Sequence, residues 1–266
     1  MRRPGSRLAE GLVTHVERVA IDGTLALQQW EQYVRALSGA GWSIVRVAEV
    51  DDCPDAVFIE DALVVFDSMG LVTRPGAQSR RPETAGAEAA AITAGLHIHH
   101  IVEPGTLDGG DVLKIGRTAY VGIGGRTNQS GVEQLAALLE PSGWRVVALP
   151  VTTVLHLKSA VTALPDGTVV GHPPSIDQGM IDHFEREGER FLAVPEQEGS
   201  HVVLLGEDGL LMSASAPRSA ALFRTLGYEP IEVDISEFEK LEGCVTCLSV
   251  RLRAETAVQA ADDLVR

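Results

Sequence analysis

Alternating apolar residues recur along this chain in segments that each follow a helix-like stretch and a glycine. GWSIVRVAEV from Gly41, GWRVVALPV from Gly143 and GYEPIEVDI from Gly227 share a glycine, an aromatic residue and a strand-like alternation. Alternation with a period of two indicates a half-buried strand, and glycine directly after a helix is typical of its C-terminal cap. Weaker copies start at Leu96 and Arg190. The pattern predicts a repeated helix–strand unit.

A pair of apolar runs follows the loop after each predicted strand. The pairs are AVFIEDALVVFDSMGLVTRP, DVLKIGRTAYVGI, AVTALPDGTVVGHPP and HVVLLGEDGLLMSAS. Two of the intervening turns contain PDG or EDG, which favour a β-hairpin. Each unit is therefore predicted to run strand, loop, hairpin and helix.

Polar residues stand at equivalent places in successive units. Asp61, Asp108, His156, His201 and Cys247 are 47, 48, 45 and 46 residues apart. Five units in a ring would bring these side chains together near its axis. The alternative is an ordinary α/β chain, in which polar residues at strand ends are common. The spacing alone leaves both interpretations open.

Composition narrows the classes of function. Hydrophobic residues make up 45% of the 266 residues, and the formal net charge is −15. Nucleic acids and anionic membranes are bound through Lys and Arg, so we expect neither as a partner, whereas a cationic substrate is compatible with this charge. The basic N-terminus is followed by no apolar signal segment, and no apolar run approaches the ~18 residues of a membrane span. The expected location is the cytoplasm.

Two of the three cysteines lie in the segment EGCVTCLSVRL, at positions 244 and 247. A structural zinc site needs four N or S ligands, and the sequence has no second C-x-x-C to complete one. A redox C-x-x-C normally opens a helix, whereas the residues around this pair are β-rich. Two interpretations are favoured: a nucleophile beside a bystander, or two small buried apolar residues.

A nucleophilic cysteine needs a histidine and a group that orients it. His156 in VLHLKSAV and Asp108 and Asp111 in TLDGGDVL have the required side chains. The competing interpretations are a histidine packed in the core and an ordinary Asp-Gly turn.

Three further clusters carry charge or metal-binding groups. Glu60 and Asp61 interrupt an apolar run, which is costly unless they face a site or a partner. Arginines can bind a carboxylate through paired hydrogen bonds, and the alternative for both clusters is a solvated loop. The histidines are compatible with a metal, although an exposed strand is favoured. The residues concerned are Asp55, Glu60 and Asp61; Arg74, Arg80, Arg81 and Arg126; and His97, His99 and His100.

The motifs in their order resemble the dimethylarginine dimethylaminohydrolase family of the guanidino-modifying pentein superfamily. The matching segments are PDAVFIEDALVV, VTRPGAQSRR, TLDGGDVL, GRTNQSG, LHLKS and TCLSV, and they cover nearly the whole chain. The set in this order is specific, although no single motif is. The resemblance implies an α/β fold, a five-fold pseudosymmetric ββαβ propeller with its active site near the central axis. We expect one catalytic domain over residues 1–253 and a C-terminal tail over 254–266.

The resemblance also implies a role for each matching residue. Cys247 corresponds to the nucleophile, His156 to the catalytic histidine and Asp108 to the acid that orients it, while Cys244 is a bystander. The implied substrate-binding residues are Asp55, Glu60, Asp61, Arg80 and Arg126, with backbone contacts from a lid near Leu12 and from Leu241.

The implied reaction converts N-omega-methylated arginine to citrulline and methylamine or dimethylamine through a covalent cysteine thiouronium. The substrate is a small cationic guanidino compound, no metal or cofactor is needed, and a homodimer is considered. The alternatives are an arginine deiminase or amidinotransferase, or a metal-binding or redox module that uses Cys244, Cys247 and the histidines at 97–100.

The chain departs from the family pattern in two places. Only MRRPGSRLAE precedes the Gly-Leu pair, so either the first unit lacks an edge strand or the natural start lies upstream. Many members carry an asparagine in the fourth unit where this chain has Ser200 and His201, which leaves the contribution of that unit open.

Overall fold

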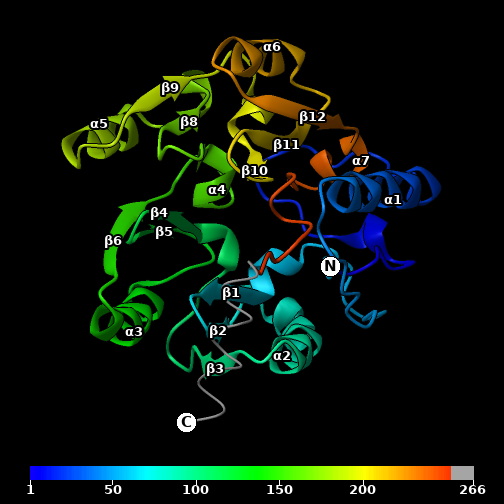
Figure 1. Ribbon diagram of the computed structural model, residues 1–266. Helices are drawn as coiled ribbons and strands as arrows, with labels where there is room; N and C mark the ends of the chain where they lie inside the picture. Colours follow the sequence, from blue (N-terminus) through cyan, green and yellow to red (C-terminus); the bar gives the residue numbers. More distant parts are fainter. Residues whose placement is uncertain (253–266) are drawn as a thin grey trace.

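The computed structural model describes residues 1–252 and contains four copies of one supersecondary unit, arranged around a ring (Figure 1). In the first copy, β1 (Leu63–Phe66) pairs antiparallel with β2 (Met69–Val72), α2 (Thr84–Thr93) crosses over, and β3 (His97–His100) pairs parallel with β2. This is the predicted ββαβ order. The predicted tail at 254–266 lies outside the described residues.

The other three copies repeat this order. Each forms a three-stranded sheet in which the middle strand pairs antiparallel with the first strand and parallel with the third. Their elements are β4 (Val112–Ile115), β5 (Thr118–Ile123), α3 (Gln129–Leu139) and β6 (Arg145–Pro150); β7 (Val161–Ala163), β8 (Val169–Gly171), α5 (Gln178–Arg186) and β9 (Phe191–Ala193); and β10 (Val202–Leu204), β11 (Gly209–Ser213), α6 (Pro217–Thr225) and β12 (Glu229–Val233).

The fifth unit is assembled from both ends of the described chain. Its helix α1 (Gly23–Gly39) packs on the segment after α7 (Ser236–Glu239), and the Tyr33 hydroxyl donates to the carbonyl oxygen of Val245 at 2.7 Å. The strand predicted from Gly41 is reduced to a single parallel bridge between Arg2 and Val47. The prediction of a strand at 43–50 is therefore wrong.

The predicted helix ends are confirmed by their glycines. Gly41, Gly143 and Gly227 have φ angles of 89°, 77° and 93°, a left-handed conformation that glycine adopts without steric cost. At the other end, the Asp22 carboxylate caps α1 by accepting from the backbone N–H groups of Thr24 and Leu25.

The first strands of the four complete units surround a central cavity of about 1000 Å³. Val64 of β1, Leu113 of β4, Thr162 of β7 and Val202 of β10 line it, while the long helices α1, α2, α3, α5 and α6 lie at the rim of the ring (Figure 1). Five apolar clusters pack between strands and helices, and each includes residues from one of the five long helices. A short helical turn precedes the first strand of each complete unit and places a polar residue toward the axis.

Those turns share one position in the unit. They are η2 (Ile59–Ala62), η4 (Gly109–Asp111), α4 (Leu157–Ala160) and η7 (Gln197–Ser200). Asp61 lies within η2, Asp108 and His156 directly precede their turns, and His201 directly follows its own. The spacing of 45 to 48 residues in the sequence therefore reflects a turn that recurs around the ring, with the polar residue inside the turn or directly beside it.

Candidate active site

The imidazole of His156 is held between two carboxylates from different units. Its Nε2 donates to Oδ2 of Asp108 at 3.0 Å, and its Nδ1 lies 3.9 Å from Oδ1 of Asp61. All three side chains are buried. The resemblance implies that Asp108 orients the histidine, and the hydrogen bond between the two side chains is consistent with that role. His156 is also buried, as the competing interpretation of a histidine packed in the core expects.

Charge, rather than burial, decides the protonation of this imidazole. Burial lowers the pKa of His156, but the carboxylates of Asp61, Asp111 and Asp108 outweigh it and raise the pKa from 6.5 to about 9. In turn, burial opposes ionisation of Asp61, while His156 and Arg80 hold the pKa of that carboxyl well below its ordinary value. The histidine is therefore a cation at neutral pH.

Asp111 fixes the start of the turn that carries His156. Its Oδ1 accepts from the backbone N–H of Leu157 at 2.9 Å, and its Oδ2 accepts from the Thr127 hydroxyl at 2.6 Å. Burial raises the pKa of Asp111 to about 6. This carboxylate acts through the backbone beside His156, so it is a positioning residue.

Gly110 allows the close approach of these groups. Its backbone N–H donates to Oδ1 of Asp61 at 2.9 Å, and a methyl group added at this position would lie 2.6 Å from Nδ1 of His156. The turn predicted from the Asp-Gly pair is therefore also a packing surface for the imidazole.

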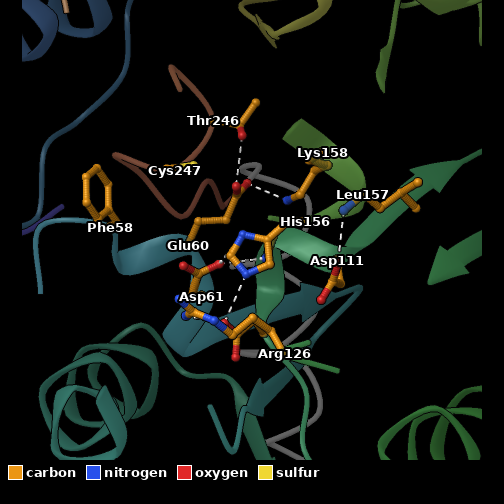
Figure 2. A network of polar contacts seen from close by, with 12 residues as sticks. Phe58, Glu60, Asp61, Asp111, Arg126, His156, Leu157, Lys158, Thr246 and Cys247 are labelled. Carbon is orange, nitrogen blue, oxygen red and sulfur yellow. Dashed lines mark hydrogen bonds and ion pairs between the residues drawn. The ribbon is translucent and has the colours of Figure 1, made fainter. Parts of the chain in front are cut away.

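Glu60 connects the histidine side of the site to the cysteine side. Its backbone N–H donates to the carbonyl oxygen of Cys247 at 3.2 Å, and its carboxylate accepts from the Thr246 hydroxyl at 2.8 Å and pairs with Nζ of Lys158 at 2.5 Å. Figure 2 shows Glu60 between Thr246 and Lys158, with Cys247 on the same side and Asp61 beside His156. Glu60 and Asp61 are consecutive, so one turn links the predicted nucleophile to the predicted histidine.

Cys247 shares its environment with Cys244. The two sulfur atoms are 3.3 Å apart, and both side chains are buried. The hydrogen bond between the sulfurs lowers the pKa of the Cys244 thiol and raises that of Cys247, and burial with the charges of Glu60 and Asp61 raises the pKa of Cys247 further. Without a cation at Glu60 and Asp61, Cys247 is a neutral thiol.

The two predicted arginines have different surroundings. Arg80 is buried; its guanidinium donates to Oδ2 of Asp61 at 2.6 Å and to Glu83 at 2.9 Å, and it also contacts the carbonyl oxygens of Asp55 and Phe58. A bound carboxylate would have to take its remaining Nη1–H group. Arg126 lies 3.4 Å from Asp108 Oδ2. Arg80 therefore has a structural role, which its sequence context did not indicate, because it holds the Asp61 carboxylate in place.

The predicted lid is tied to the site by two carboxylates. Asp55 Oδ1 accepts from the backbone N–H of Leu12 at 2.9 Å. The Glu242 carboxylate accepts hydrogen bonds from the backbone N–H groups of Thr14 and His15 at 2.6 and 2.7 Å. Glu242 itself has a left-handed backbone conformation, with a φ of 61°. A methyl group at Gly11 would touch both Asp55 and Leu241. Leu12, Asp55 and Leu241, which the sequence separates widely, therefore lie together.

One group within residues 1–252 has the ligand spacing for a metal ion. Asp61, Asp108 and His156 each offer one donor atom, and these atoms lie within 4.8 Å of one another. The cysteines and the histidines at 97–100 form no such group among the described residues. The metal-module alternative therefore has no ligand set in this part of the chain.

Known proteins similar to this chain include one that matches nearly all of it. An N(G),N(G)-dimethylarginine dimethylaminohydrolase of Streptomyces coelicolor is 63% identical over 253 residues, which cover 95% of this chain and 96% of the relative. The chain belongs to this family. A family model described as arginine deiminase also matches residues 79–199.

Solved structures agree with this membership. A dimethylarginine dimethylaminohydrolase of Pseudomonas aeruginosa, a cysteine-to-serine mutant complexed with citrulline, superposes with a TM-score of 0.86 at 31% identity, covering 94% of this chain and 97% of that one. The N-terminal domain of the cyanobacterial arginine dihydrolase ArgZ has a TM-score of 0.85 at 20% identity, which shows the fold alone. The pentein fold expected from the resemblance is therefore confirmed. No helix among the described residues is long and apolar enough to span a membrane.

Several residues of this family member were not singled out from its sequence. Lys158 and Thr246 hold the Glu60 carboxylate, and Glu242 holds the lid. Lys158 and Thr246 each lie within two residues of a predicted catalytic residue, and this proximity in sequence is a signal that could have identified them. The sequence around Glu242 carries no such signal, because nothing in it indicates that this carboxylate contacts residues 14 and 15.

Proposed function

We propose that this chain hydrolyses N-omega-methylated arginine to citrulline and methylamine or dimethylamine, with Cys247 as the nucleophile. The observation that supports this most strongly is the His156 imidazole, a buried cation held by Asp108 and Asp61 and linked through Glu60 to Cys247. The 63% identity to a dimethylarginine dimethylaminohydrolase names the substrate class.

Substrate recognition uses charge at both ends of an arginine. Glu60 and Asp61 face the guanidinium, whose positive charge they stabilise, and Arg126 with the remaining Nη1–H of Arg80 binds the α-carboxylate. Asp55 and the backbone at 12 and 241 take the α-amino group. The two buried carboxylates at this position favour a positively charged group over a neutral one.

Nucleophilic attack depends on the ionisation of Cys247. A guanidinium beside Glu60 and Asp61 offsets the two charges that disfavour a thiolate at 247. The sulfur electron pair then forms a bond to the guanidinium carbon and gives a tetrahedral adduct. His156, protonated below a pH of about 9, gives its proton to the departing dimethylamine as the C–N bond breaks. A cysteine thiouronium remains.

Hydrolysis of the thiouronium reverses the role of His156. The imidazole, now neutral, takes a proton from water, and the hydroxide forms a C–O bond to the thiouronium carbon. The C–S bond breaks, the sulfur electron pair returns to Cys247, the hydroxyl proton of the adduct passes to that sulfur, and neutral citrulline leaves. One water is consumed and one amine released in each cycle. Asp108 and Asp111 keep the imidazole in place through both halves.

A product assay tests this proposal. Purified protein is incubated with dimethylarginine, monomethylarginine and arginine, and citrulline is measured. We expect citrulline from the methylated substrates and none from Cys247→Ser, while Cys53→Ser, at the third cysteine, stays active. Faster turnover of free arginine would assign the chain to the deiminase alternative, and an active Cys247→Ser would refute the nucleophile.

The organisation of the chain is part of the proposal. We propose a single catalytic domain through residue 253, supported by the ring of units in residues 1–252, which closes only when both ends meet in the fifth unit. The cytoplasmic location and a homodimer remain predictions from composition and resemblance. Fractionation and light scattering would test them.

A further inference from the structure

A second thiol touches the proposed nucleophile and has no part in the reaction. The sulfur atoms of Cys244 and Cys247 are 3.3 Å apart. Their side chains are 3% and 5% exposed, so both sulfurs lie in the protein interior next to the site. The family resemblance implies that Cys244 is a bystander, and the β-rich sequence around the pair disfavours a redox site, which normally opens a helix. The two cysteines lie at the ends of a turn, which brings their sulfur atoms together without a helix.

The turn sets the two cysteines at a distance that a disulfide can span. The backbone N–H of Cys247 donates to the carbonyl oxygen of Cys244 at 3.1 Å, so the cysteines are the first and last residues of a four-residue turn. The Cα atoms at the ends of such a turn lie less than about 7 Å apart, and disulfides join Cα atoms about 4.4–6.8 Å apart. The sulfurs need only approach from 3.3 Å to the bond length of about 2.05 Å.

We propose that Cys244 and Cys247 form a reversible disulfide when the protein meets a peroxide. The disulfide withdraws the sulfur of Cys247 from attack, and this consequence rests on the proposed function. The bond itself does not, because it requires only two thiols, one turn and an oxidant.

The oxidation balances with hydrogen peroxide as the named oxidant. A thiolate of the pair attacks one peroxide oxygen, the O–O bond breaks, and with one proton a sulfenic acid and a water form. The sulfur of the other cysteine then attacks the sulfenic sulfur, forms the S–S bond and expels hydroxide, which takes the remaining thiol proton to leave as water. Two electrons pass from the thiols to the peroxide. Two molecules of an external thiol reverse the change and become a disulfide themselves.

The surroundings favour this route over irreversible damage. The hydrogen bond between the sulfurs makes one proton of the pair easier to lose than that of an isolated buried thiol, and the thiolate is the form that reacts with peroxide. A neighbour at 3.3 Å captures the sulfenic acid before a second peroxide oxidises it to the sulfinic acid, which thiols do not reduce. Cys53, whose sulfur contacts the carbonyl oxygen of Ser79 at 3.6 Å, provides an internal reference.

Thiol counting and activity recovery test the proposal separately. The chain has three cysteines. Wild-type protein is treated with hydrogen peroxide, denatured, and titrated for free thiols, and the peptide containing residues 244 and 247 is analysed by mass spectrometry. We expect two of the three thiols to disappear, a mass loss of two hydrogen atoms in that peptide, and loss of citrulline production that dithiothreitol reverses. Cys53→Ser should lose the same two thiols.

Cys244→Ser is the decisive variant. Treated in the same way, it should form no disulfide between positions 244 and 247, and whatever fraction of Cys247 is oxidised should proceed to sulfinic acid and stay inactive after dithiothreitol. The proposal is overturned if wild-type protein retains its thiols or gains oxygen at Cys247 instead of losing hydrogen, or if Cys244→Ser recovers as well as the wild type. A chain that formed the disulfide but never turned over methylarginine would refute the proposed function and leave the disulfide standing.

Discussion

Replacement of Gly110 by alanine tests whether the imidazole position controls the reaction. Gly110 has an ordinary φ, so alanine fits its backbone and the substitution acts only through the added methyl group. That group would lie 2.6 Å from Nδ1 of His156 and 2.7 Å from Oδ1 of Asp61, whereas ordinary contact begins at 3.4 Å. The ring and the carboxylate must therefore retreat by about 0.8 and 0.7 Å.

The expected loss follows from that displacement. Displacing a reacting group by about 1 Å can cost about 100-fold in rate, and overpacking a filled interior costs about 1–3 kcal/mol of stability. We therefore expect kcat for dimethylarginine to fall on the order of 100-fold in Gly110→Ala. The melting temperature should fall by about 2–4 °C for each kcal/mol lost. The protein should stay folded, so the lost activity is separable from unfolding.

Steady-state citrulline production and thermal unfolding measure the two effects on one sample. Gly125→Ala is the matched control, because it makes the same change in a loop where an added methyl group meets no atom within 4 Å. It should behave as wild type in both assays. If Gly110→Ala lost no more activity than Gly125→Ala, the imidazole would tolerate displacement, and the argument that this turn positions it would be wrong.

Three further predictions concern groups around the site. Lys158→Met leaves the buried Glu60 carboxylate without its 2.5 Å partner and should cost about 3–5 kcal/mol in urea unfolding, whereas Lys158→Arg should cost less. The pKa of His156 is raised from 6.5 to about 9, so its stabilisation is complete below pH 6.5 and is lost as the pH rises through 9. Between pH 6.5 and 9 the free energy of unfolding should therefore fall more for wild-type protein than for His156→Gln. Equal losses would refute the raised pKa of His156. Glu242→Gly removes two lid hydrogen bonds worth about 1 kcal/mol each, about 2 kcal/mol together, so KM for dimethylarginine should rise roughly 30-fold with kcat little changed. An unchanged KM would show that the lid is held elsewhere.

The repeat could be predicted because each unit has the same local signals. Gly143 and Gly227 end helices in a left-handed conformation and precede observed strands, as the sequence indicated. Gly41 ends its helix in the same way, yet the predicted strand after it is only the bridge at Val47. The first two have a neighbouring strand in β5 or β11, whereas the third meets only Arg2. Alternation indicates a preference for strand, and the partner decides whether the strand forms.

The sequence indicated which residues belong to the candidate site, but only some of the contacts between them. Asp108 and His156 meet as expected, because both directly precede equivalent turns around the ring. The pairing of Arg80 with Asp61 and Glu83 was not foreseen, since an arginine in a loop gives no sign of whether it will be buried. The pKa of His156 could not be predicted either, because the carboxylates that raise it from 6.5 to about 9 are brought together only by the fold.

The raised pKa of His156 and the neutral thiol of Cys247 have one electrostatic origin. The carboxylates of Glu60 and Asp61 disfavour a thiolate at 247, and Asp61 favours the protonated imidazole at 156. In the proposed reaction, a guanidinium that binds these carboxylates weakens both effects together: the thiol loses its proton more easily, and the imidazole gives up its own more readily to the departing amine. Substrate charge thus prepares the nucleophile and the acid in one event. Citrulline, which is neutral at the same position, leaves both groups as they were, so the product is not attacked again.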